Sequence, residues 1–198
     1  MKREEIICQL LRDTERPGTS LLIQYLYDSG FFTAPCSTQH HLAKEGGLAE
    51  HSLNVLEFAE RINESLSASV RKDSLIICSL LHDIGKCGQF GKPGYIPNML
   101  KGRATKANPN PEPVQSAAKP FIANPDLRYI DHEVRSVVVI SRFIDLTEDE
   151  QQAILWHNGL YGPFKYEIQG KETPLYMILH FADMWASRVI EREEEADE

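Results

Sequence analysis

Apolar residues recur at three- and four-residue steps along most of this chain, and sustained alternation of apolar and polar positions is almost absent. This spacing follows one face of an α-helix, whereas alternation would indicate strands. The pattern therefore predicts an all-α protein of six or seven helices. They are expected to cover about residues 3–13, 17–30, 47–66, 72–85, 131–144, 147–157 and 173–193.

Local signals fix some of these helices more sharply. The stretch Thr147-Glu-Asp-Glu150 reads as a capping box, in which threonine and glutamate satisfy each other's free backbone amides. Pro174 suits the first position of the last helix, where a missing amide costs least. Residues 75–81 are apolar on nearly every side, so the helix over 72–85 is expected to lie at the centre of the core.

Residues 88–131 break the helical pattern. They hold seven of the eleven prolines and carry six basic against three acidic side chains. Long loops in compact domains are usually functional or disordered. We therefore expect an irregular, Pro-rich insertion that is either a surface feature or a basic lid over a phosphate. A shorter irregular stretch, 159–171, is expected to contain a small hairpin around 166–171.

The length of 198 residues and the 42% hydrophobic content suit one globular domain spanning residues 1–198. No run approaches the roughly 18 apolar residues of a membrane span, so a cytoplasmic location is the default expectation. The cysteines show no Cys-x-x-Cys spacing and are expected to be reduced thiols. They are Cys8, Cys36, Cys78 and Cys87.

The formal net charge of −8 argues against tight, sequence-independent binding to long nucleic acid, because such binding needs a basic surface. Part of the acidity lies in residues 191–198, which we interpret as a solvated helix end. A small phosphorylated molecule, such as a nucleotide, is the expected substrate. The sequence is also compatible with a homodimer.

A spaced series of histidines and aspartates indicates a buried metal site. Imidazole and carboxylate are ligands of borderline divalent metals, and six of them can hold two ions. Asp83 closes a largely apolar helix, where an unpaired charge is costly and a cation would compensate it. Two ions in one pocket are typical of phosphoester hydrolysis. The series is His51, His82, Asp83, His132, His157 and Asp183.

The motifs that carry these residues resemble the HD-domain metal-dependent phosphohydrolases. The core of the resemblance is Gly46-Gly-Leu-Ala-Glu-His-Ser52, followed by Leu80-Leu-His-Asp-Ile-Gly-Lys86 and by Ala182-Asp183. His132-Glu-x-x-Ser136 and Trp156-His157-Asn-Gly159 are similar to a subgroup with two additional histidines. Such members tend to hold two metals. The resemblance covers most of the chain and implies a helical HD-domain fold.

The resemblance implies that His51, His82, Asp83 and Asp183 hold a first ion, and that Asp83 bridges to a second ion held by His132 and His157. One or two ions of manganese, iron, nickel, zinc, cobalt or magnesium would serve as cofactor. A water between the ions would become a nucleophile near neutral pH. Lys86 would contact a phosphoryl oxygen or offset the helix dipole. Candidate proton donors for the leaving oxygen are His41, His132 and Glu133.

Other side chains have smaller expected roles. His180 precedes Asp183 by three residues on the same helix face, which favours support of the metal ligands from behind. His40 is expected to be exposed. Packing is the expected role of three aromatic residues that could alternatively stack a base, namely Tyr161, Phe164 and Trp185.

The sequence thus predicts a divalent-metal-dependent phosphohydrolase acting on a nucleotide or another small phosphoester. One alternative is a phosphodiesterase or 3'-5' exonuclease acting on cyclic nucleotides or short oligonucleotides. The Gly-Gly-Leu-x-Glu-His-Ser stretch is similar to that of bacterial exoribonucleases with this domain, although no OB-like module is visible here. Two further alternatives are a non-catalytic metal or nucleotide sensor and an unrelated helical protein whose histidines coincide.

Overall fold

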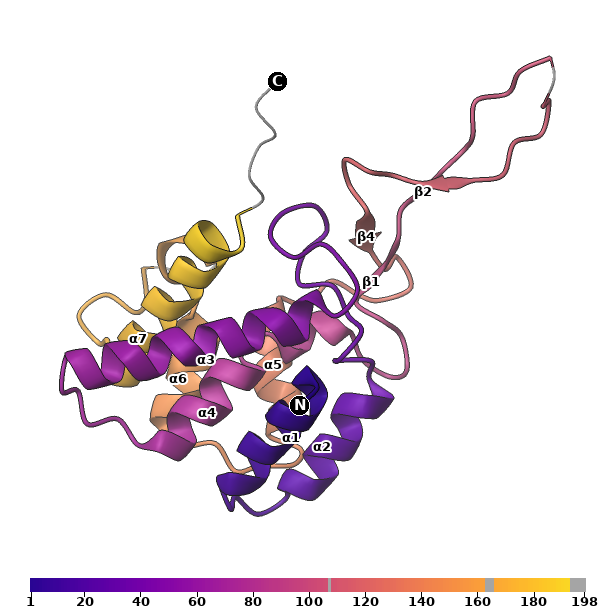
Figure 1. Cartoon of the computed structure of the whole chain (residues 1–198). Coiled ribbons are helices and arrows are strands. Elements are labelled where there is room, and N and C mark those ends of the chain that lie inside the picture. Colours follow the sequence, from indigo (N-terminus) through magenta and orange to yellow (C-terminus); the bar gives the residue numbers. More distant parts are fainter. Residues whose placement is uncertain (107, 163–165, 193–198) are drawn as a thin grey trace.

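The computed structural model describes residues 1–106, 108–162 and 166–192, without the side chain of Leu160. Helices pack side by side in this part of the chain, and a thin arm leaves them (Figure 1). The α-helices are α1 (Arg3–Asp13), α2 (Thr19–Asp28), α3 (Gly47–Ser65), α4 (Lys72–Leu81), α5 (His132–Ile140), α6 (Glu148–Trp156) and α7 (Pro174–Trp185). The predicted all-α class is confirmed.

Three short helices and four short strands complete the described elements. Helices η1 (Ile84–Cys87) and η2 (Gly159–Tyr161) are 3-10 helices, and η3 (Ala186–Ile190) is a π-helix that continues α7. The strands are β1 (Tyr95–Pro97), β2 (Met99–Leu100), β3 (Val114–Gln115) and β4 (Phe121–Ala123).

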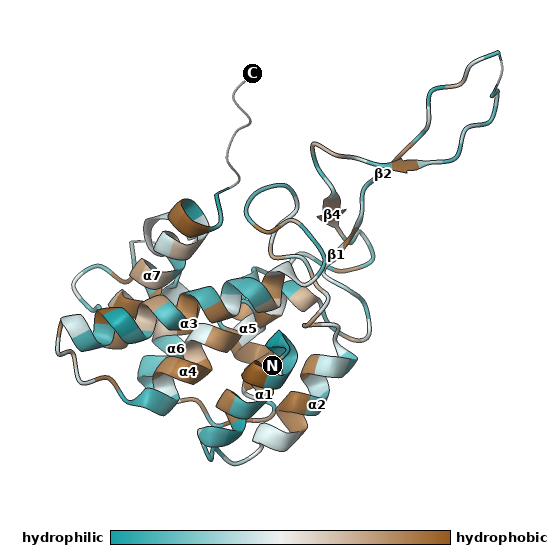
Figure 2. Ribbon diagram, in the orientation of Figure 1, coloured by the Kyte–Doolittle hydropathy of each residue, from teal (hydrophilic) through white to brown (hydrophobic). Residues whose placement is uncertain are grey.

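Helix α4 lies at the centre of the core, as its apolar sequence predicted. Eight of its ten residues are buried, from Ser74 to Leu81, and it packs against α1, α3, α6 and α7. Apolar residues follow α4 and the inner faces of its neighbours, while polar residues cover the outside (Figure 2). Full burial of a large aliphatic side chain contributes about 1.5–3 kcal/mol, so this helix anchors the helices around it.

Helix α4 ends before residue 85, where the sequence predicted its end, and the turn that follows it positions Asp83. The α-helix ends at Leu81, and η1 follows it from Ile84. A Cβ atom on Gly85 would lie 2.3 Å from the backbone oxygen of His132, so only glycine permits this approach of η1 to α5. The Gly85 amide also donates to Oγ of Ser136 at 2.9 Å. The turn after Asp83 is thereby fixed against the start of α5.

Two helix starts follow the sequence signals closely. Thr147 and Glu150 form the predicted capping box, with the Thr147 amide donating to Oε2 of Glu150 at 2.8 Å. Helix α7 begins with Pro174 after a Thr173 cap. Two helix ends differ, because α5 stops at Ile140 and continues as turns, and the last helix changes from α to π geometry after residue 185.

The expected irregular insertion, residues 88–131, forms an arm. Two antiparallel strand pairs run along it, β1 with β4 and β2 with β3. The pairs are short because proline interrupts a sheet, and Pro97 ends β1 opposite Phe121. The arm extends away from the helices (Figure 1). The hairpin expected around 166–171 is absent, because those described residues form turns.

Among the described residues, no helix is long and apolar enough to cross a membrane. All four cysteines are free and buried, which agrees with their interpretation as reduced thiols.

Candidate metal centre

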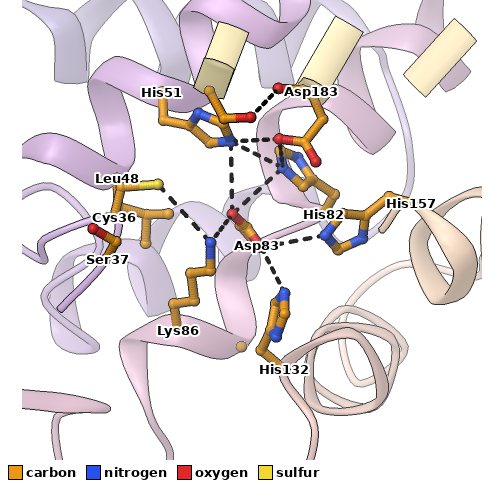
Figure 3. A network of polar contacts seen from close by, with 12 residues as sticks. Cys36, Ser37, Leu48, His51, His82, Asp83, Lys86, His132, His157 and Asp183 are labelled. Carbon is orange, nitrogen blue, oxygen red and sulfur yellow. Dashed lines mark hydrogen bonds and ion pairs between the residues drawn. The ribbon is translucent and has the colours of Figure 1, made fainter. Parts of the chain in front are cut away.

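The structure brings the six predicted metal ligands together at one point (Figure 3). Helices α3 and α7 supply one ligand each, and the turn between α4 and η1 supplies the adjacent pair. The start of α5 and the end of α6 supply the other two. In chain order these ligands are His51, His82 with Asp83, His132, His157 and Asp183.

The carboxylate of Asp83 lies between two groups of imidazoles. Its Oδ2 is 3.6 Å from Nε2 of His51 and 3.5 Å from Nε2 of His82. Its Oδ1 is 3.3 Å from Nε2 of His132 and 3.5 Å from Nε2 of His157. Each oxygen therefore faces its own pair of nitrogen donors, and Asp83 is shared by both.

Asp183 completes the group on the Oδ2 side. Its Oδ1 lies 3.1 Å from Nε2 of His51 and 4.0 Å from Nε2 of His82. The two imidazole Nε2 atoms are themselves 3.3 Å apart. Two nitrogen and two oxygen donors thus converge, in numbers and types that suit one divalent ion.

Two of the histidines are held by their own helices. Nδ1 of His82 lies 3.0 Å from the backbone oxygen of Ser79, and Nδ1 of His157 lies 2.8 Å from that of Ile154. A carbonyl accepts a hydrogen bond, so Nδ1 carries the proton in each ring. Nε2 is then left with the lone pair that a metal requires.

The other two histidines have carboxylates beside Nδ1. Nδ1 of His51 is 2.9 Å from Oε2 of Glu191, and Nδ1 of His132 is 3.2 Å from Oε2 of Glu133. All four rings therefore present Nε2 to Asp83. This common orientation is the arrangement expected of histidines that ligate through Nε2.

The surroundings of the Asp83 carboxylate indicate whether the site fits a metal. Its Oδ1 is buried and makes no hydrogen bond to any residue that the structure describes. A buried oxygen without a partner is costly, and a cation would remove that cost. Burial alone would raise the pKa of Asp83, but the Lys86 ammonium and the neighbouring His82 hold the pKa well below its usual range. The carboxylate is therefore ionised, as ligation requires, and the donor set fits.

Lys86 is the cation nearest to this carboxylate. Its Nζ lies 2.5 Å from Oδ2 of Asp83, and its side chain is 13% exposed. Burial alone would lower the pKa of Lys86, but Asp83 outweighs it and raises the pKa. Lys86 is therefore charged, and it lines the cavity beside the metal ligands. Both expected roles of Lys86 remain predictions.

A cavity of about 720 Å³ opens on the cluster. It is lined by the proposed ligands Asp83, His157 and Asp183 and by two exposed arginines, Arg188 and Arg192. Guanidinium groups in the same cavity as carboxylates and imidazoles suit a phosphorylated molecule, because arginine pairs readily with phosphate oxygens.

His41 lies in the same cavity, next to the first group of ligands. Its ring centroid is 5.2 Å from that of His51, and its Nε2 is 3.4 Å from Sγ of Cys36. Burial lowers the pKa of His41 to about 4. His41 is thus a pocket residue, and His40, which also lines the cavity, is exposed as the sequence predicted.

The remaining predicted side chains lie around the site. Nδ1 of His180 donates to the backbone oxygen of His157 at 2.7 Å, so His180 supports that ligand's backbone. The Arg188 guanidinium lies 4.2 Å from the ring centroid of Tyr161, which is 68% exposed. Trp185 packs near Phe58 in a separate apolar groove. Phe164 lies outside the described residues.

Sequence reasoning missed two residues that contact the ligands. Glu191 was assigned to a solvated helix end, which is wrong for this residue because it is 7% exposed and contacts His51. Arg192 is exposed, as that assignment predicts, and residues 193–198 lie outside the described residues. Nδ2 of Asn158 lies 3.2 Å from Nε2 of His132 and 3.3 Å from Nε2 of His157. Its position next to His157 in Trp-His-Asn-Gly was the available signal.

Comparison with known proteins agrees with this geometry. The HD domain family model matches residues 48–186. The chain belongs to the HD domain family. It is 30% identical over 109 residues to the 3'-5' exoribonuclease YhaM of Geobacillus sp. (strain WCH70), a match that covers 52% of this chain and 33% of that protein. This chain therefore spans about a third of that relative's length. No solved structure matches it.

Membership of the family confirms the resemblance found in the sequence and agrees with the helical fold. HD domains bind divalent metals, and the histidine and aspartate cluster could hold such an ion.

Proposed function

We propose that this HD-domain protein hydrolyses phosphodiester bonds of short nucleotide substrates with two divalent ions. The observation that carries the proposal is the position of Asp83, whose two oxygens face separate pairs of nitrogen donors at 3.3–3.6 Å. Paired ions in one pocket are typical of phosphate ester cleavage. The proposed ligands are His51, His82, Asp83 and Asp183 for one ion, and Asp83, His132 and His157 for the other.

When bound, such ions supply a water that is deprotonated near neutral pH and positive charge beside the phosphoryl oxygens. The protein's own contribution begins with cations that hold the substrate. Lys86 lines the cavity together with the proposed ligands, so its ammonium can face a non-bridging oxygen while its salt bridge to Asp83 restrains it. Arg188 and Arg192 line the same cavity and would bind further phosphates.

The leaving oxygen needs a proton, and the chain offers groups for that task. His41 lines the cavity without belonging to either pair of donors around Asp83. Glu133 is 2% exposed, and its Oε2 lies 3.2 Å from Nδ1 of His132 but makes no hydrogen bond to a described residue. We propose Glu133 as the group that holds this proton. His41, whose pKa burial lowers to about 4, is neutral near pH 7 and would donate a hydrogen bond to the leaving oxygen. His132 takes the proton role only if it does not bind the second ion.

The Geobacillus relative is a 3'-5' exoribonuclease, which favours a phosphodiester bond. Two further observations favour a short nucleotide over long nucleic acid. The cavity volume of about 720 Å³ lies in the range of small-molecule sites, and the formal net charge of −8 disfavours a long polyanion. The same volume also suits a mononucleotide, so a nucleotide phosphomonoesterase is the second candidate.

Turnover of defined substrates tests the proposal. Wild type with Mn²⁺ is incubated with an end-labelled short oligoribonucleotide, a cyclic nucleotide and a nucleoside monophosphate. Release of nucleotides from the oligoribonucleotide, lost in Asp83→Ala and kept in the exposed-site control Asp28→Asn, supports phosphodiester hydrolysis. Release of inorganic phosphate alone favours the phosphomonoesterase. Metal binding without any turnover would overturn the enzymatic proposal for this chain.

A further inference from the structure

We infer that Glu191 is a positioning residue for the first metal site, because it holds the His51 ring by the nitrogen that faces away from the cluster. The inference rests on the proposed metal site and adds a residue that neither the motif nor the family match, which ends at residue 186, includes. Figure 3 shows the His51 ring among the ligands that its Nε2 faces.

The contacts of Glu191 are short and buried. Its Oε1 and Oε2 lie 3.0 and 2.9 Å from Nδ1 of His51. Nδ2 of Asn54 donates to Oε1 at 2.8 Å, which holds the carboxylate against the ring. His51 is 0% exposed and Glu191 is 7% exposed. A buried carboxylate needs such partners, and His51 and Asn54 supply them.

One helical segment holds both nitrogens of His51. Asp183 lies 3.1 Å from Nε2 and Glu191 lies 2.9 Å from Nδ1. Glu191 follows Asp183 by eight positions. In a continuous α-helix, with about 100° per residue, the two side chains would point about 80° apart. The π-helix η3 between them has wider turns and brings Glu191 back towards the face of Asp183.

The hydrogen bond has a specific chemical effect on His51. A carboxylate that accepts from Nδ1–H fixes the tautomer, so that the Nε2 lone pair points at Asp83 and Asp183. It also makes the imidazole a stronger donor to a cation. Loss of such an outer partner typically weakens metal affinity by about 10–100-fold.

His82 and His157 do not depend on a distant side chain in this way. Their Nδ1 atoms are held by backbone oxygens of the preceding helical turn. Glu191 should therefore influence the ion bound by His51 and leave the ion bound by His132 and His157 nearly unchanged. This selectivity separates a positioning role from a general anchoring of the chain end.

The test is Mn²⁺ binding to the full chain, followed by electron paramagnetic resonance, together with thermal unfolding of the metal-free protein. The variants are Glu191→Ala, Glu191→Gln and the control Glu50→Gln. Glu50 lies beside His51 on α3, but its carboxylate pairs with Arg3 and Lys44. Glu191→Ala should weaken one Mn²⁺ affinity by about 10–100-fold. Glu191→Gln should weaken it less, because an amide oxygen still accepts from Nδ1–H, and Glu50→Gln should match wild type.

Three outcomes would count against the inference. Unchanged Mn²⁺ affinity in Glu191→Ala would remove the positioning role. An equal loss at both ions, with a lower unfolding temperature of the metal-free variant, would make Glu191 a structural anchor only. Wild type that binds no Mn²⁺ would overturn the proposed metal site and the inference with it.

Discussion

Nε2 of His132 lies 3.3 Å from Oδ1 of Asp83, the oxygen that points away from His51 and His82. A second histidine, His157, lies 3.5 Å from the same oxygen. The two additional histidines of the sequence are thus both on one side of the shared carboxylate. This placement is what a separate second ion would require, and it makes the number of ions a direct test.

Removal of this pair should remove one ion. In His132→Ala with His157→Ala, the second group of donors keeps only one oxygen of Asp83, which cannot hold a divalent ion tightly. We expect about two metal equivalents per chain in wild type and about one in the double variant, measured by elemental analysis of protein purified without chelator. The control is His40→Ala, because His40 is exposed and is not one of the proposed ligands.

One equivalent in both proteins would contradict the two-ion site. The remaining ligands would then be those around Oδ2 of Asp83, and His132 and His157 would be left to bind phosphate or transfer protons. That result would favour the phosphomonoesterase candidate, since the two-ion argument for phosphodiester cleavage would be gone.

The basic side chains of the arm give a second prediction. Lys101 and Arg103 are exposed and follow β2, on the part of the arm that extends away from the helices (Figure 1). Lys101→Ala with Arg103→Ala should therefore raise KM for an oligoribonucleotide several-fold and leave KM for a small chromogenic phosphodiester unchanged. Lys2→Ala with Arg12→Ala removes the same charge elsewhere and is the control. If the arm variant has the same KM as wild type for both substrates, the arm does not contribute to substrate binding.

The sequence predicted those features that depend on neighbouring residues. The start of α6 was readable because Thr147 and Glu150 are three residues apart, and the buried place of α4 followed from its unbroken apolar run. The six proposed ligands stood out as a spaced series of histidines and aspartates, of which Asp83 and Asp183 follow or lie in largely apolar stretches. Glu191 was missed because it opens a run of acidic residues, and charge runs are usually solvated. Only the fold shows that η3 turns it towards His51.

The contacts of Arg16, which contribute to stability, could not be predicted from the sequence either. It lies between α1 and α2, yet its guanidinium contacts Asp73 of α4 at 3.0 Å and also Glu150 of α6. Glu150 is 0% exposed and accepts from Oγ of Ser74 at 2.7 Å. Such partners lie far apart in the chain, so no local pattern reveals them. The arrangement pairs the buried Glu150 carboxylate with a guanidinium whose side chain is 15% exposed.

Arg16→Ala should therefore destabilise the fold strongly. The variant leaves the Glu150 carboxylate buried without its cation, which typically costs about 3–5 kcal/mol. Urea unfolding should give this loss in the free energy of unfolding, and Arg16→Ala combined with Glu150→Gln should recover much of it. The control is Arg61→Ala, because Arg61 forms an exposed pair with Glu57. A loss no larger than that of the control would contradict a stabilising contact between Arg16 and the buried Glu150.

The lowered pKa of Asp73 predicts how stability changes as the pH falls. Burial alone would raise its pKa, but hydrogen bonds from Arg71 and Arg16 outweigh it and lower the pKa below the ordinary value of 3.8. Folding then favours the ionised carboxylate. Its contribution to stability is fully present above pH 3.8 and is lost as the pH falls through the lower pKa of the folded state.

The stability difference between wild type and Asp73→Asn isolates this contribution, because asparagine does not titrate. Urea unfolding of both proteins should show a constant difference at neutral and mildly acidic pH, and the difference should shrink as the pH falls below 3.8. Its size should be modest, because Arg71 and Asp73 form a solvent-screened pair in which the Arg71 side chain is 73% exposed. A difference that grows on acidification would mean that the folded state raises the pKa of Asp73, and the proposed role of Arg16 and Arg71 as its partners would then be wrong.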